Sequence, residues 1–240
     1  MQKIAGGSVF CSELFFLGGC LIMKVNNKTF KLVFSALMVA LSVVLSFFKI
    51  EFLYGGSITI FSMVPLVLIA QMYGVPWGML TGVVYGLIQM VMGLKNFSYV
   101  TGIEAYAMVA AFDYIVAFGV IGLAGCTRKI KNRAVAASLG AVIACIMRFF
   151  CHFLSGITVW KALEWNDAPA FISERMLQPD MVPYTYSLMY NGGYMFPELI
   201  LTAIGSAILC TIVFEVFKID VNATKKLKAK AAEEEKKTEE

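Results

Sequence analysis

The feature that most constrains the fold of this chain is a series of long apolar stretches separated by short polar links. Six stretches, the second of them short, come close to the ~20 residues that a bilayer crossing requires. They cover residues 30–49, 58–74, 76–93, 104–125, 133–160 and 190–217. Hydrophobic residues make up 59% of the chain and charged residues 15%, against about 25% charged in soluble domains. The sequence therefore predicts an all-α integral membrane protein with six transmembrane helices, crossing the lipid bilayer of the cell membrane several times.

The link between the fourth and fifth stretches indicates how the chain is oriented. Residues 127–133 hold four basic side chains and no acidic one, which by the positive-inside rule predicts a cytoplasmic loop. With six crossings, the N- and C-termini are then both cytoplasmic. We expect an N-terminal extension at 1–29, a six-helix membrane domain at 30–218 and a charged cytoplasmic tail at 219–240. Met23 precedes a polar run typical of an N-terminus, so we expect translation to start there and residues 1–22 to be absent from the native protein.

Several function classes find no support in the motifs. The six cysteines form no C-x-x-C pair, and the chain has a single histidine, no H-E-x-x-H, no serine elbow and no P-loop. No basic stripe is interleaved with exposed aromatic residues, as nucleic-acid binding would require. We therefore expect neither an enzyme nor a nucleic-acid-binding protein, and no metal or resident cofactor.

Polar residues inside the apolar stretches are the candidates for a functional site. Arg148, His152, Gly156 and Trp160 are spaced by four, so on a helix they share one face. Asp113 and Glu198 lie within two other stretches at comparable depth. Ionisable groups in a membrane are costly and usually lie together or line a wet cavity. We expect the four ionisable groups from three helices to meet between the outer half and the middle of the membrane.

The charges of this group suggest a ligand. Asp113 and Glu198 oppose only Arg148, with His152 taken as neutral, so one positive charge is missing. A carboxylate among aromatic rings suits a flat cation, and the amide of Asn191 can donate and accept at a heterocycle edge. The aromatic candidates are Tyr114, Trp160, Tyr186, Tyr190 and Tyr194. Two structural alternatives stay open: an Arg148–His152 pair that bonds a neighbouring helix, or an acid paired with Arg148 while the tyrosines form an interfacial belt.

Five segments together resemble a known family, the thiamine-specific S components of energy-coupling factor (ECF) transporters, ThiT or YuaJ. The segments are 54–59, 62–65, 113–125, 148–160 and 186–194, of which the last three in this order are specific. The similarity extends over about residues 30 to 217. It implies a six-helix S component that binds thiamine from the outside and delivers it through a complex with a membrane-embedded T subunit and two ATPases.

The resemblance also implies roles for individual residues. Ala36 and Ala40 correspond to the small-residue step by which the family docks the T subunit. The family acid can be Glu, and here it is the shorter Asp113. The family's Trp in the first outer loop is absent, and we expect Tyr54 or Phe52 in its place. With Glu198 added for its charge and depth, the expected ligand-binding residues are Asp113, Tyr114, His152, Trp160, Tyr186, Asn191, Tyr54 and Glu198.

The predicted function is thus ATP-driven thiamine import with partner subunits, with thiamine as the transported ligand. The first alternative is an S component for another vitamin or heterocyclic cation, because the scaffold does not fix the ligand. The second is a stand-alone secondary transporter, although the chain lacks the internal repeats common in that class.

Overall fold

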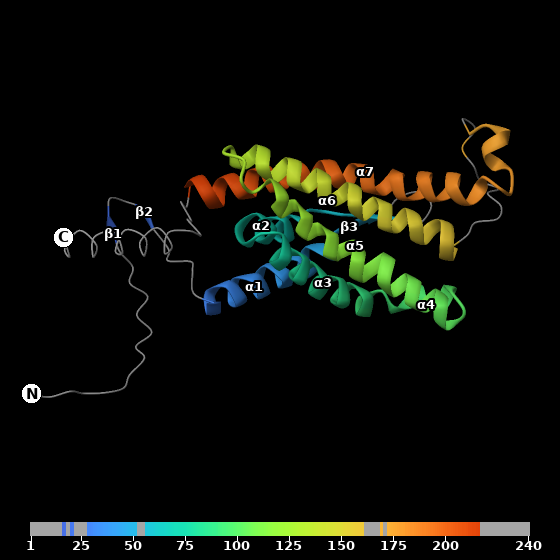
Figure 1. Ribbon diagram of the computed structural model, residues 1–240, viewed down its shortest axis with the longest axis horizontal. Helices are drawn as coiled ribbons and strands as arrows, with labels where there is room; N and C mark the ends of the chain where they lie inside the picture. The colour runs from blue at the N-terminus through green and yellow to red at the C-terminus, as the bar shows by residue number, and fades with distance from the viewer. Residues whose placement is uncertain are drawn as a thin grey trace, which may run out of the picture.

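The computed structural model describes residues 16–17, 20–21, 28–51, 56–160, 169 and 172–216. These residues are mostly helical, and the long helices run along one axis of an elongated bundle (Figure 1). The α-helices are α1 (Lys28–Ser46), α2 (Val64–Tyr73), α3 (Val75–Met92), α4 (Ile103–Val109), α5 (Val116–Gly119), α6 (Arg133–Ser155) and α7 (Val182–Thr211). The 3-10 helices are η2 (Leu94–Tyr99), η4 (Val120–Thr127) and η6 (Glu174–Leu177), and the π-helices are η3 (Ala110–Ile115), η5 (Gly156–Trp160) and η7 (Ile212–Val216).

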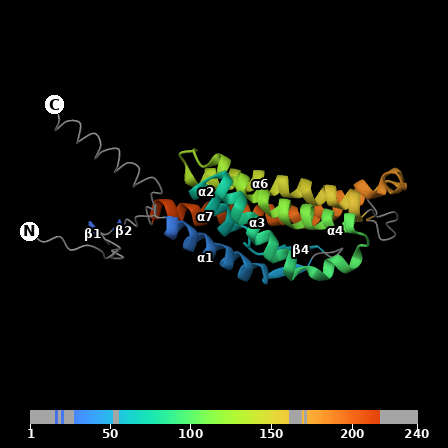
Figure 2. The ribbon, with the colours of Figure 1, turned by 60° about the horizontal axis from the view of Figure 1, so that its bottom comes forward.

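Short strands accompany the helices, so the expectation of an all-α chain is slightly wrong. Strand β1 (Phe16–Leu17) pairs antiparallel with β2 (Cys20–Leu21), and β3 (Lys49–Glu51) pairs antiparallel with β4 (Ser57–Thr59). The β3–β4 pair links α1 to α2 and lies beside α7 (Figure 2). It therefore brings an extended segment of chain into the helical bundle.

Within the described residues, five helical stretches are long and apolar enough to cross a membrane. They are Lys28–Ser46, Val75–Met92, Ile103–Thr127, Arg133–Trp160 and Val182–Glu215. Each corresponds to an expected stretch, although the last begins at Val182 rather than at 190. The second expected stretch, 58–74, differs: it contains β4, a turn and the ten-residue helix α2.

Helix α2 is short because it is a core element. Residues 64–72 are all buried, and a helix that is apolar on every side is typical of a protein interior. Its one buried amide, Gln71, donates to the carbonyl oxygens of Ala124 (2.6 Å) and Ala136 (3.1 Å). These bonds tie α2 to η4 and α6, and the one to Ala124 satisfies a carbonyl in the last part of η4, where intrahelical partners run out.

A row of glycines lets α3 approach the segment from η3 to η4 closely. Gly78, Gly82 and Gly86 recur every four residues, so they lie on one face of α3. A Cβ atom on Gly82 would clash with the carbonyl of Phe118, and one on Gly86 would lie 2.6 Å from the carbonyl oxygen of Tyr114. Small residues one turn apart allow such backbone contact between membrane helices.

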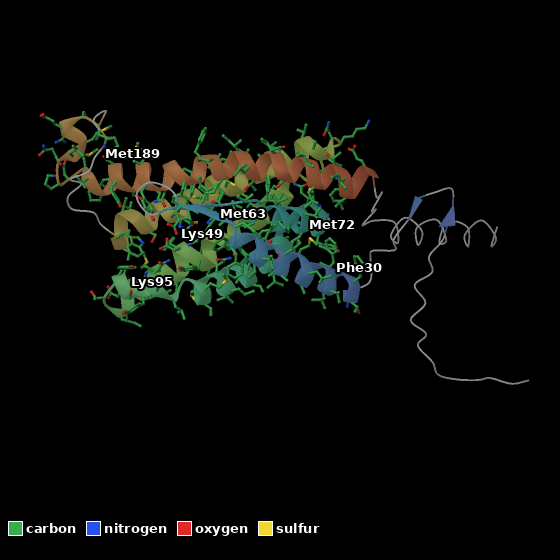
Figure 3. The ribbon with its side chains drawn as sticks, turned by 180° about the vertical axis from the view of Figure 1, so that it is seen from behind. Phe30, Lys49, Met63, Met72, Lys95 and Met189 are labelled. Carbon is green, nitrogen blue, oxygen red and sulfur yellow. The ribbon has the colours of Figure 1, made fainter. Side chains whose placement is uncertain are left out.

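The two ends of the bundle differ in charge. The start of α1, the α2–α3 corner, the η4–α6 link and the end of α7 lie at one end (Figures 1 and 3). At this end, the Lys31 ammonium lies 3.7 Å from the centroid of the Trp77 ring, and the Arg133 guanidinium lies 5.0 Å from that of Phe214. Arg128 packs on Gly74, whose φ of +90° suits glycine at a sharp corner. In Figure 3, Phe30 and Met72 lie toward this basic end, and Lys95 and Met189 lie toward the opposite end.

Candidate ligand-binding site

The centre of the candidate site is the carboxylate of Asp113. His152 on α6 holds one carboxylate oxygen, with Nδ1 3.2 Å from Oδ1. Trp160 on η5 holds the other, with its indole Nε1 donating to Oδ2 at 3.2 Å. The structure thus brings together three of the expected ligand-binding residues. His152 and Trp160 each contribute a nitrogen to the carboxylate of Asp113.

Two of these three residues lie in π-helical turns. Asp113 belongs to η3 and Trp160 to η5, so the regular four-residue stripe expected from Arg148 to Trp160 is interrupted after Ser155. A π turn is wider than an α turn, and such turns occur frequently at functional sites. Here they set the directions in which the carboxylate and the indole meet.

One polar atom at this centre has no partner. The Nε2 atom of His152 is buried, and among the described residues nothing forms a hydrogen bond with it. Buried polar groups in proteins are nearly always hydrogen-bonded, to protein, water or ligand. The geometry therefore leaves a hydrogen-bonding position for a further molecule beside Asp113.

Asn191 on α7 lies against the backbone of the same histidine. Its Nδ2 donates to the Ser187 carbonyl (3.0 Å) and hydroxyl (3.2 Å), with the His152 carbonyl 3.4 Å away. Tyr186, one turn earlier on α7, is half-buried and stacks on Tyr190 with ring centroids 5.8 Å apart. Asn191 therefore borders the Asp113 centre, and the tyrosines continue the polar and aromatic face of α7 beyond it.

Glu198 is bonded to partners other than the three residues of this centre. Arg148 donates from Nη1 to its Oε2 at 2.8 Å, and Thr59 of β4 donates to its Oε1. The Arg148 guanidinium also lies 4.7 Å from the centroid of the Phe118 ring. Both side chains are at least nine-tenths buried. The four expected ionisable groups thus form two pairs, Arg148 with Glu198 and His152 with Asp113, and the first pairing is one that a structural alternative allowed.

Tyr114 also points elsewhere. Its hydroxyl accepts from the Asn96 amide at 2.9 Å and lies 3.3 Å from the Gly93 carbonyl, while its ring stacks on Phe97. The side chain is buried against η2, so the structure does not bring it to His152 and Trp160. Of the other expected residues, Tyr54 and Phe52 lie outside the described part, and Ala36 and Ala40 lie on the exposed face of α1.

The sequence of residues 32–218 matches the family model of the thiamine transporter protein, Thia_YuaJ. The chain belongs to this family. It is 30% identical over 203 residues to the thiamine transporter ThiT of Bacillus subtilis strain 168, a match that covers 79% of this chain and 93% of the relative. It is 22% identical over 168 residues to the thiamine transporter ThiT of Lacticaseibacillus paracasei, covering 65% and 75%.

A solved structure shares the fold. The structure of ThiT from Listeria monocytogenes superposes with a TM-score of 0.61 at 21% identity, covering 79% of this chain and 98% of that one. Membership of the Thia_YuaJ family makes the chain a transporter rather than an enzyme. With its membrane-spanning helices, it is a multi-pass protein of the cell membrane.

Several contacts at the site were not anticipated from the sequence. Ser187 and Tyr194 hold the Asn191 amide, and Thr59 holds Glu198. The contact of Ser187 with Asn191 could have been predicted from the sequence, because a serine four residues before an asparagine on a helix lies on the same face. The contact of Thr59 with Glu198 could not have been predicted in this way, since the two residues are 139 positions apart in the sequence.

Proposed function

We propose that this chain is the substrate-binding S component of an ECF-type transporter and takes up thiamine from the outer side of the membrane. The observation that carries the proposal is the charge at Asp113. Arg148 and Glu198 neutralise each other, whereas an imidazole and an indole, neither with a fixed positive charge, hold Asp113. The thiazolium ring of thiamine carries the cation that this acid lacks.

Individual residues then have distinct tasks in binding. Asp113 would attract the thiazolium charge, and the Trp160 ring would stack on the ligand, because an indole face binds cations well. The Nε2 of His152, which has no partner among the described residues, and the amide of Asn191 would bond polar atoms of the aminopyrimidine ring. Tyr186 would add a second aromatic wall. Together these interactions match a flat ligand with one charged ring and one polar ring.

The arrangement in the membrane that we infer has six crossings, with both termini in the cytoplasm. Helix α2 spans about 15 Å at 1.5 Å per residue, half of the ~30 Å hydrocarbon layer. The three-residue strand β4 before it adds about 10 Å at 3.3 Å per residue. Ile58, Ser62 and Met63 are buried in protein, the condition under which non-helical backbone is tolerated at membrane depth. The basic end of the bundle would face the cytoplasm.

Energy for import would come from other subunits, because the sequence holds no P-loop. We propose that a T subunit docks on the exposed face of α1 at Ala36 and Ala40 and connects the chain to two ATPases. A bulky side chain there, as in Ala40→Trp, should abolish thiamine uptake by cells and leave thiamine binding by the purified protein unchanged. Loss of both thiamine uptake and thiamine binding would show that Ala40 is needed for folding and not for docking.

The test of the proposed ligand is a titration of the detergent-purified protein with thiamine, followed by intrinsic tryptophan fluorescence. Stacking on Trp160 predicts saturable quenching, and Trp160→Phe should remove most of the quenching. A well-folded protein without any response would keep the transporter fold and direct the search to another vitamin or heterocyclic cation.

A further inference from the structure

The side-chain amide of Asn191 is held in one orientation. Its nitrogen faces the carbonyls of Ser187 and His152, and carbonyl oxygens only accept hydrogen bonds. The NH₂ group must therefore point toward them, and the amide oxygen must point the other way. On that side the hydroxyl of Tyr194 donates to Oδ1 at 3.0 Å. The two amide hydrogens are thus engaged within the protein, and the second lone pair of Oδ1 is the part left for a ligand.

The ring of Tyr194 is itself fixed by its neighbours. It is 9% exposed and packs edge-on against Tyr190, with ring centroids 5.7 Å apart. On another side it lies against Gly56, the residue just before β4. A Cβ atom at Gly56 would clash with the ring and lie 2.9 Å from its Cγ. The fit between Gly56 and the ring therefore determines where the hydroxyl of Tyr194 lies.

We propose that Tyr194 is a positioning residue for Asn191. The contact of its ring with Gly56, in the β3–β4 connection, fixes the place of the Tyr194 hydroxyl. Held in this way, Asn191 presents only a hydrogen-bond acceptor to the ligand. The site then favours a heterocycle that carries an amino group at this edge over one that carries a carbonyl oxygen. This inference rests on the proposed function, because it takes Asn191 as a ligand-binding residue.

The test compares two ligands on matched variants. The ligands are thiamine and its analogue with a carbonyl oxygen in place of the exocyclic amino group of the pyrimidine. Tyr194→Phe removes the hydroxyl and keeps the ring, and Tyr184→Phe makes the same change at an exposed position of α7. Losing one net hydrogen bond should weaken thiamine binding about three- to tenfold in Tyr194→Phe.

The ratio of the two dissociation constants separates positioning from a general structural role. Without the Tyr194 hydroxyl the amide is held only at its nitrogen, so its oxygen is no longer fixed toward the amino group of thiamine. In Tyr194→Phe the preference for thiamine over the analogue should therefore fall at least threefold. Tyr184→Phe should keep the wild-type ratio. Gly56→Ala, which displaces the ring, should lower the preference as well, and the double variant Gly56→Ala/Tyr194→Phe should lose little more than either single one.

The outcomes distinguish this inference from the proposed function. Wild-type protein that binds neither ligand would overturn both. Wild-type protein that prefers thiamine, with an unchanged ratio in Tyr194→Phe, would overturn the positioning role alone. Equal losses for both ligands would also overturn it, because a merely structural change weakens the two alike. If Gly56→Ala keeps the wild-type ratio while Tyr194→Phe lowers it, the contribution of the β3–β4 connection is overturned.

Discussion

The bundle contains two acid–base pairs built from similar parts, and they differ in charge balance and in exposure to solvent. In the first, Arg148 pairs with Glu198, and Thr59 also holds that acid. In the second, Asp113 pairs with His152 and receives the indole of Trp160. The first pair is formally neutral and buried in the protein. Each pair keeps one buried nitrogen without a hydrogen-bond partner among the described residues, Nε of Arg148 and Nε2 of His152. The second pair differs because its acid has no fixed cation and its indole is 39% exposed.

This difference indicates which pair the fold needs and which one the ligand needs. A buried ion pair that links α6, α7 and β4 joins segments that are distant in the sequence, so its loss should affect stability. A pair with an uncompensated charge is costly to the fold, and a bound cation would relieve that cost. Stability and affinity should therefore respond to different substitutions.

The largest expected effect comes from breaking the first pair, Arg148 with Glu198. Arg148→Met keeps much of the side-chain volume and leaves Glu198 as an unpaired buried charge. Removing one partner of a buried pair typically costs about 3–5 kcal/mol. We expect a large fall in the melting temperature of the purified protein in detergent. An unchanged melting temperature would show that this pair does not hold the helices together.

Two further variants control that measurement. Arg148→Met/Glu198→Gln removes both charges and should recover much of the lost stability, because no buried charge is left unpaired. Arg175→Met breaks an exposed pair with Asp180 at 3.3 Å, and exposed pairs contribute only about 0–1 kcal/mol. That variant should melt close to the wild-type temperature.

A smaller effect, on the affinity for thiamine, is expected from a change in the second pair, Asp113 with His152. His152→Asn keeps a polar atom near the position of Nδ1 and removes the buried Nε2, which has no partner within the described residues. Thiamine binding should weaken about tenfold, the equivalent of one hydrogen bond near the upper end of its usual range. Calorimetric titration measures this change, and the melting temperature should stay near that of the wild type. A strongly lowered melting temperature with unchanged affinity would place His152 among the structural residues.

The long crossings could be predicted from the sequence because an apolar run of sufficient length indicates a membrane helix by itself. The second stretch could not be read in this way. Composition does not distinguish a segment buried among other helices from one that faces lipid, and α2 is buried all round. The π turns at Asp113 and Trp160 were also missed, because hydropathy does not report which carbonyl each amide bonds.

The site was partly predictable for a similar reason. Asp113, His152 and Trp160 stood out as polar or aromatic residues in apolar runs, and the structure brings them together. Arg148 lies one turn from His152 on the same helix, yet it meets different neighbours, which only the packing of α7 and β4 decides. Tyr114 follows Asp113 directly, and successive helical residues point in different directions, so the two side chains diverge.

The most direct test of the role of Asp113 is the dissociation constant of thiamine for Asp113→Asn. The amide keeps the shape and one acceptor oxygen and removes the charge. Losing a close charge pair with a bound cation should weaken binding at least about a hundredfold. The melting temperature should hardly change, and Glu104→Gln, an exposed acid at the start of α4, should bind as the wild type does. Wild-type affinity in Asp113→Asn, together with lost binding in a folded Glu198→Gln, would assign the ligand to the other acid.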